Sequence, residues 1–130
     1  MLRDASVQPM LPVDDLEAAS KFYEQTLGLK KVDSFPGVAL TYESGGRTLV
    51  VYRSEFAGTN KGTAALWEVD DVEGTAKTLK AKGVTFEKFD MPGMTRDGDV
   101  YRAGDMKVVW FKDPAGNILS VQNHPGKKPH

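Results

Sequence analysis

Hydrophobic and polar residues alternate along most of the first half of this chain, and one segment follows a helical spacing instead. The alternation over residues 7–13 predicts a strand with Leu11 and Val13 on one face. A helix is predicted next, because apolar residues recur at helical spacing up to Leu27 and Gly28 can end the helix. Alternation then returns in three short predicted strands, which are residues 29–34, 38–42 and 47–53.

The second half repeats this order of elements. A strand is predicted over residues 63–69, and a helix follows that runs to about Lys82. Three more strands are predicted after it: residues 84–89, 107–112 and 117–122. Each half is therefore predicted to have the order strand, helix and three strands.

Two echoes in the sequence indicate that the halves are copies of one unit. Residues 69–73 nearly repeat residues 13–17, at a spacing of 56 positions. Residues 110–121 mirror residues 40–51, at a spacing of 70 positions. Self-similarity of this kind is typical of a supersecondary unit that is used twice. We therefore predict a duplicated βαβββ module, with any active site between the two copies.

The repeated Val-Asp-Asp motif also predicts where the two helices begin. Asp14 and Asp70 have the chemistry of an N-cap residue, because a short carboxylate can accept hydrogen bonds from the free N–H groups of the first turn. A glutamate three residues further on can complete a capping box in each copy, at Glu17 and Glu73.

A chain of 130 residues is long enough to form one domain with a core of its own. We predict a single domain, with module one at about residues 6–54, module two at about residues 63–122, and a polar tail at residues 123–130. The segment between the modules is small and polar and reads as a linker. A module of roughly 60 residues would be marginal alone, so we expect the two to share one core.

The stretch from Asp90 to Asp105 has no counterpart in module one. Loops of this length inside a compact domain are usually functional or disordered. Met91, Met94 and Tyr101 would give such a loop an apolar surface. We therefore consider residues 90–105 a candidate lid for a pocket.

Charge and composition exclude several classes of function. Lys and Arg number 17 against 18 Asp and Glu, so nothing favours a nucleic-acid partner or a membrane surface. The absence of cysteine excludes disulfides and thiolate metal sites. No apolar run approaches the roughly 18 residues that span a bilayer, and the first residues lack the apolar segment of a signal peptide. The expected location is the cytoplasm.

Three segments of the chain, residues 11–29, 67–73 and 110–119, resemble the vicinal oxygen chelate superfamily of glyoxalase I, bleomycin-resistance proteins and extradiol dioxygenases. The resemblance implies an α+β fold. Its two βαβββ modules form one curved mixed eight-stranded sheet around a central cavity, with the helices outside. The resemblance also implies a homodimer. The likeness is specific for the fold and weak for the function, because this scaffold carries many chemistries.

Most enzymes of this superfamily bind a divalent metal through His, Glu or Gln side chains on the inward strands. The resemblance assigns the ligand positions to Gln8, Val50, Ala64 and Ser120, and the spacings of the internal repeat pair them in the same way. Valine and alanine offer no donor atom, and the chain's only histidines are His124 and His130, in the tail. A substitute site that recruits Glu68 and Gln122 would still lack an imidazole on the inward strands. We therefore expect no metal cofactor.

Strand alternation also assigns side chains to the two faces of the sheet. Residues expected beneath the helices are Leu11, Val13, Ala65, Trp67 and Val69. Tyr52 has the parity of a pocket residue but could equally lie in water at the rim. Trp110 is assigned to the core and Phe111 to the pocket, unless a bulge at the turn of residues 113–116 exchanges them. The predicted ligand-binding residues are Gln8, Met10, Val50, Tyr52, Ala64, Leu66, Glu68, Phe111, Ser120 and Gln122.

These expectations favour a metal-free protein that binds a small molecule. Because Glu68 is the one candidate inward charge, we expect the ligand to be a neutral, largely apolar or aromatic metabolite or antibiotic. The alternative is an enzyme, either a glyoxalase-type lyase or isomerase or a dioxygenase. It would need a non-standard metal site, or metal-free acid–base catalysis by a group such as Glu68. The sequence leaves open whether any catalysis occurs.

Overall fold

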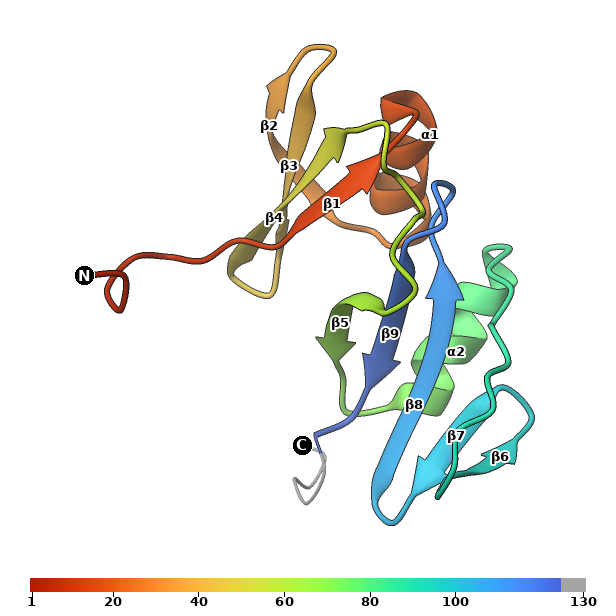
Figure 1. The fold of residues 1–130 in the computed structure, drawn as a ribbon. Coiled ribbons are helices and arrows are strands. Elements are labelled where there is room, and N and C mark those ends of the chain that lie inside the picture. The colour runs from red at the N-terminus through yellow and green to blue at the C-terminus, as the bar shows by residue number, and fades with distance from the viewer. Residues whose placement is uncertain (125–130) are drawn as a thin grey trace. The chain divides into compact units, whose positions relative to one another are not determined.

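The computed structural model describes residues 1–124, which fall into two compact units (Figure 1). Unit 1 contains residues 1–59 and 114–117, and unit 2 contains residues 60–113 and the chain from Ile118 onward. The boundary after Thr59 lies inside the predicted linker. Each unit combines one sheet with one helical segment, so the predicted α+β class and the two-module architecture are confirmed. In the part of the chain described, no helix is long and apolar enough to cross a membrane.

Unit 1 is built on a four-stranded sheet with the order β1-β4-β3-β2. Its strands are β1 (Met10–Val13), β2 (Lys30–Phe35), β3 (Ala39–Ser44) and β4 (Arg47–Arg53). β1 runs parallel to β4, and the other neighbours are antiparallel. The helix α1 (Leu16–Lys21) contacts β3 and β4 and covers one face. Leu11 and Val13 are fully buried, as their alternation predicts.

The first helix begins one residue later than predicted. Asp15, not Asp14, is the N-cap, and its Oδ1 accepts hydrogen bonds from the backbone N–H groups of Glu17 (3.0 Å) and Ala18 (3.1 Å). The predicted capping box is therefore wrong, since Glu17 lies too early in the first turn to bond back to the cap. The helix continues as a π-helical turn, η1 (Phe22–Thr26), and Gly28 follows with a φ of 75°, as expected for a glycine at a helix end.

Unit 2 is built on a five-stranded sheet with the order β5-β9-β8-β7-β6. Its strands are β5 (Thr63–Glu68), β6 (Thr95–Asp97), β7 (Val100–Ala103), β8 (Met106–Lys112) and β9 (Ile118–Gln122). β5 is parallel to β9, which repeats the relation of β1 to β4. The helix α2 (Val72–Ala81) packs on β8 and β9 through three buried residues, Val72, Ala76 and Leu79.

The second helix also starts one residue later than predicted. Asp71 is the N-cap in place of Asp70, and its Oδ1 accepts from the Gly74 N–H at 2.9 Å. Glu73 does not close a capping box. Its Oε1 instead lies 2.6 Å from the Lys107 ammonium on β8, whose hydrogen bond lowers the pKa of the Glu73 carboxyl.

The predicted strand at residues 84–89 is wrong, and so is the predicted loop at residues 90–105. Residues 84–89 make one isolated bridge, Phe86 to Phe111, and the Glu87 N–H donates to the Trp110 carbonyl at 2.7 Å. The hairpin β6–β7 lies inside the predicted loop. Its strand β7 pairs with the first half of β8, and β6 forms one edge of the sheet. The described residues therefore contain nine strands, where eight are predicted.

Candidate functional site

Four of the predicted ligand-binding residues belong to unit 1. Val50 lies directly opposite Met10 in the β1–β4 pair, and Tyr52 lies opposite Pro12, so all three predicted residues occupy the sheet face that points away from Leu11. Met10 is 57% exposed, and Val50 and Tyr52 are half-buried. Gln8 is exposed and precedes β1, outside the strand pairing. The structure thus brings together Met10, Val50 and Tyr52, whereas Gln8 lies in the segment that precedes β1.

The remaining predicted residues belong to unit 2, and most share one face of its sheet. Leu66 pairs with Ser120, and Glu68 pairs with Gln122, across β5 and β9. Ser120 pairs in turn with Trp110, and Gln122 with Val108, across β9 and β8. Because direct cross-strand partners lie on the same face, these residues form two adjacent rows. We call this side of the sheet the Trp110 face; its residues are Leu66, Glu68, Val108, Trp110, Ser120 and Gln122. Val108 and Ser120 are buried.

Two predicted residues depart from this arrangement. Ala64 lies at a break in register, since Thr63 pairs with Ile118 and Ala65 with the very next residue of β9. Phe111 lies on the opposite face, beneath α2, where it is fully buried and packs edge-to-face against Phe86 at 6.0 Å between ring centroids. The assignment of Phe111 to the pocket side of the sheet is therefore wrong.

Trp110, assigned to the core from the sequence, takes the place expected for Phe111. No bulge is needed to turn it, because the β8–β9 register is continuous across Lys112 and Ile118. The length of the connecting turn, residues 113–117, sets that register. Trp110 is half-buried and Leu66 is 49% exposed. The indole ring and the aliphatic side chain therefore lie on either side of Ser120 in one row of the sheet.

The indole of Trp110 is held from several sides. Its Nε1–H donates a hydrogen bond to Thr63 Oγ1 at 3.2 Å. Phe89 and Tyr101 meet it edge-on, at 5.6 and 5.2 Å between ring centroids. Tyr101 is itself fixed, since its hydroxyl accepts from the Phe89 N–H at 2.6 Å and donates to the Phe89 carbonyl at 2.8 Å. A ring immobilised in this way loses little conformational entropy when a ligand stacks on it.

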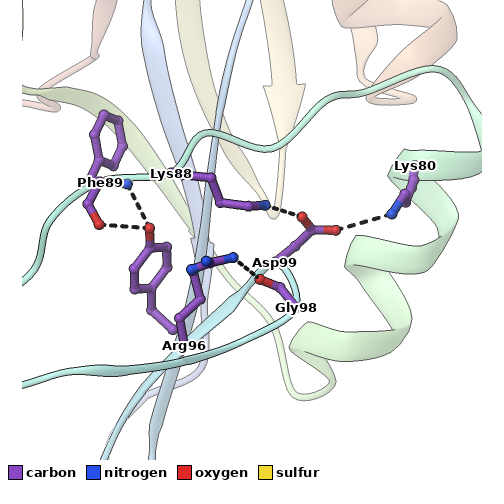
Figure 2. Close-up of polar contacts among 7 residues, drawn as sticks. Lys80, Lys88, Phe89, Arg96, Gly98 and Asp99 are labelled. Carbon is purple, nitrogen blue, oxygen red and sulfur yellow. Dashed lines mark hydrogen bonds and ion pairs between the residues drawn. The ribbon is translucent and has the colours of Figure 1, made fainter.

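A charged cluster fixes the part of unit 2 that carries Phe89 and Tyr101 (Figure 2). Asp99, in the turn between β6 and β7, accepts from the Lys88 ammonium and lies 3.4 Å from the Lys80 ammonium on α2. The hydrogen bond from Lys88 is the main cause that lowers the pKa of the Asp99 carboxyl. Arg96, on β6, donates to the carbonyl of Gly98 in the same turn at 2.8 Å. The cluster ties the hairpin to the helix, and the role of residues 90–105 as a lid stays a prediction.

An acid–base pair lies at one end of the Trp110 face. The Nδ1 atom of His124 is 3.3 Å from Glu68 Oε2, and Glu68 is the cross-strand partner of Gln122. Both side chains are more than half exposed. The sequence gives no signal for this contact, because His124 lies beyond the last strand in what reads as a polar tail.

The residues at the four metal-ligand positions implied by the family resemblance offer few donor atoms. Val50 and Ala64 are hydrocarbon side chains, so only Gln8 and Ser120 offer an oxygen or nitrogen atom. A protein site for a catalytic transition metal needs about three donors. Elsewhere in residues 1–124, no group of three His, Cys, Asp or Glu side chains is placed to hold a metal ion. The donor set of this chain therefore does not fit the superfamily's usual metal centre.

Solved structures of known proteins share this fold. The lactoylglutathione lyase of Agrobacterium tumefaciens is 22% identical, with 93% of this chain and 95% of that chain covered and a TM-score of 0.67. The antibiotic binding protein TnmS3 of Streptomyces sp. CB03234 is 23% identical, with 92% and 97% covered and a TM-score of 0.64. A glyoxalase family protein of Enterococcus faecalis is 19% identical, with 95% and 100% covered and a TM-score of 0.70. At these identities the likeness shows the fold alone.

The sequence itself matches a family model over nearly its whole length. Residues 6–121 match the model described as Glyoxalase/Bleomycin resistance protein/Dioxygenase superfamily. No curated protein sequence matches the chain significantly. The matched range contains strands β1 to β8 of the described structure completely, and all of β9 except its last residue, Gln122. The chain therefore belongs to the glyoxalase/bleomycin resistance protein/dioxygenase superfamily.

Proposed function

We propose that this protein binds a small neutral ligand, largely apolar or aromatic, on the Trp110 face. The observation that carries the proposal is the half-buried Trp110 ring, braced by Phe89 and Tyr101 and in one row with the exposed Leu66. An indole and an aliphatic side chain favour a flat, weakly polar molecule. Gln122, in the next row, supplies an amide that can orient a carbonyl or hydroxyl group.

The composition of the metal-ligand positions supports binding without a metal. Val50 and Ala64 cannot coordinate an ion, and they extend the apolar character of the surfaces around Met10 in unit 1 and Leu66 in unit 2. Gln8, Met10, Val50 and Tyr52 of unit 1, and Ala64 of unit 2, stay proposed ligand-binding residues. The antibiotic binding protein TnmS3, which has the same fold, gives a precedent for an antibiotic as the ligand.

The experiment is a thermal-shift screen of aromatic metabolites and antibiotics, followed by titration of tryptophan fluorescence. A ligand at about 100 times its Kd raises the free energy of unfolding by roughly 2.7 kcal/mol. Trp110→Ala is expected to weaken binding by roughly tenfold or more, since it removes a stacking surface. Trp67→Phe is the matched control, because Trp67 lies on the α2 face of the same sheet. Equal affinity in the wild type and in Trp110→Ala would contradict the proposal.

A second candidate function is metal-free acid–base catalysis, and the pair of Glu68 and His124 favours it. Their 3.3 Å separation lets the imidazole donate to the carboxylate, and both groups are open to a substrate. Glu68→Gln would then abolish turnover, because the neutral amide cannot take up a proton. A pure binder would instead turn over no compound of the screen, with or without the substitution.

We also propose that the protein is a cytoplasmic homodimer. The support is the exposure of two apolar side chains at and just before β1, since Val7 and Met10 are 87% and 57% exposed. Burial of such side chains against a second copy would remove them from water. Light scattering after size exclusion should give about twice the chain mass, and Met10→Lys should shift the protein toward the monomer. A monomer in the wild type at all concentrations would reject the dimer.

A further inference from the structure

Unit 1 contains an open depression of about 490 Å³ that none of the predicted ligand-binding residues lines. It is lined by Asp14, Gly37, Val38, Arg53, Ser54 and Glu55. Small-molecule sites in proteins commonly occupy a few hundred to about 1,000 Å³. The depression therefore has room for a metabolite, and it lies at the carboxyl ends of two parallel strands, β1 and β4.

Backbone hydrogen bonds hold together the three chain segments that form the depression. The Ser54 N–H donates to the Val13 carbonyl at 2.9 Å and joins the residue after β4 to the last residue of β1. The Arg53 N–H donates to the Val38 carbonyl, also at 2.9 Å, and joins β4 to the turn between β2 and β3. That turn is tight, with Gly37 at a φ of 73°. The backbone positions of the lining residues are therefore fixed by the sheet.

The depression is lined by charged side chains of both signs. Arg53 contributes a guanidinium, and Asp14 and Glu55 contribute carboxylates. No ion pair joins any of these three side chains to another residue in the part of the chain that the structure describes. With two carboxylates against one guanidinium, the lining favours a ligand with a net positive charge that also carries one anionic group.

We propose that this depression is a second binding site, and that its ligand is a small cationic amino acid. The ligand carboxylate would form a bidentate pair with the Arg53 guanidinium, the geometry that arginine prefers. The two ammonium groups would face Asp14 and Glu55. The methylene chain would lie against Val38, whose side chain is 50% exposed. The Ser54 hydroxyl accepts from the Phe56 N–H at 3.0 Å, so its own proton is free to bond the carboxylate.

The proposal can be tested by titration of the full-length protein with L-lysine, followed by backbone amide resonances. We expect saturable shifts at Gly37, Val38 and Ser54. Two relatives of L-lysine separate the contributions: cadaverine lacks the carboxylate, and L-norleucine lacks the side-chain ammonium. Both should bind at least about tenfold more weakly, since each leaves a charged group of the site without its partner.

Substitutions in β4 provide a matched pair. Arg53→Gln should weaken L-lysine binding by about tenfold or more, because it removes the charge that pairs with the carboxylate. Arg47→Gln, at the opposite and exposed end of the same strand, should leave the affinity unchanged. If Arg53→Gln does not fold, Glu55→Gln, which lies outside the strand, takes its place with the same expectation.

Three results would overturn the proposal: no shift of these amides by millimolar L-lysine, an unchanged affinity in Arg53→Gln, or equal binding of cadaverine. Ligand binding at Trp110 is read from fluorescence and from different residues. Failure of either site therefore leaves the other unaffected.

Discussion

Trp110 and Ser120 are direct cross-strand partners in β8 and β9, so their side chains lie on the same face of the sheet in unit 2. The neighbouring Phe111 consequently points to the other face, beneath α2. This one relation of register decides which of two adjacent aromatic residues is available to a ligand and which stabilises the core.

The first prediction concerns that division of roles. Phe111 is fully buried, and Phe111→Ala should lower the free energy of unfolding by about 3–5 kcal/mol, because it removes apolar contacts and leaves a cavity. The same substitution at Phe56, which is 73% exposed, should change it by less than about 0.5 kcal/mol. Urea denaturation measures both values. Similar costs at the two sites would show that Phe111 is not a core residue.

The second prediction concerns the start of α2. Asp71→Ala should destabilise the protein by about 1 kcal/mol, because the Gly74 N–H loses its acceptor at 2.9 Å. Asp70→Ala, one residue earlier, should have little effect, since Asp70 is not the cap. Urea denaturation distinguishes the pair, and a larger cost at Asp70 would restore the capping box predicted from the sequence.

The third prediction concerns pH. The hydrogen bond from Lys88 lowers the pKa of the Asp99 carboxyl in the folded state. A group of this kind adds stability that is complete above its unfolded pKa and is lost as the pH falls through its folded pKa. Asp99→Asn should therefore cost up to about 1 kcal/mol at pH 7, the range of a partly exposed ion pair, and almost nothing near pH 2.

The control for the pH experiment lies on the same hairpin. Asp97 is 84% exposed and its carboxylate is 4.0 Å from Arg102, so Asp97→Asn should show a much smaller difference between the two pH values. Urea midpoints measured across the acid range give the comparison. A cost of Asp99→Asn that stays constant down to pH 2 would show that charge pairing does not hold the hairpin.

The sequence predicts well those parts of the fold in which burial or backbone conformation directly determines the type of residue. Leu11 and Val13 alternate because one face of β1 is buried, and Gly28 ends the first helical segment because its backbone is left-handed. The strand β6 is missed because all three of its residues, Thr95 to Asp97, are exposed and show no alternation. Two adjacent aspartates leave each N-cap ambiguous by one residue, and only backbone geometry resolves the choice.

The candidate site is harder to predict because it depends on register and on distant contacts. Both Trp110 and Phe111 are large and apolar, so composition cannot rank them, and the hairpin turn at residues 113–117 decides. The contact of His124 with Glu68 joins a strand to a segment after the last strand, and no local pattern reports it. The rows of β5 and β9, by contrast, follow from strand parity, and the structure confirms that Leu66, Glu68, Ser120 and Gln122 share a face.

The last prediction concerns metal content. Because Val50 and Ala64 occupy two of the four implied ligand positions, protein purified without a tag should contain far less than one nickel, zinc or iron ion per chain by elemental analysis. A chelator should leave the melting temperature unchanged, since these positions offer too few donors to hold an ion that would stabilise the folded state. An assay with methylglyoxal and glutathione should yield no product above background. One metal ion per chain, lost to the chelator together with product formation, would contradict the metal-free binding function and favour a glyoxalase-type reaction. The donors of such an ion would then have to come from a non-standard site, because Val50 and Ala64 supply none.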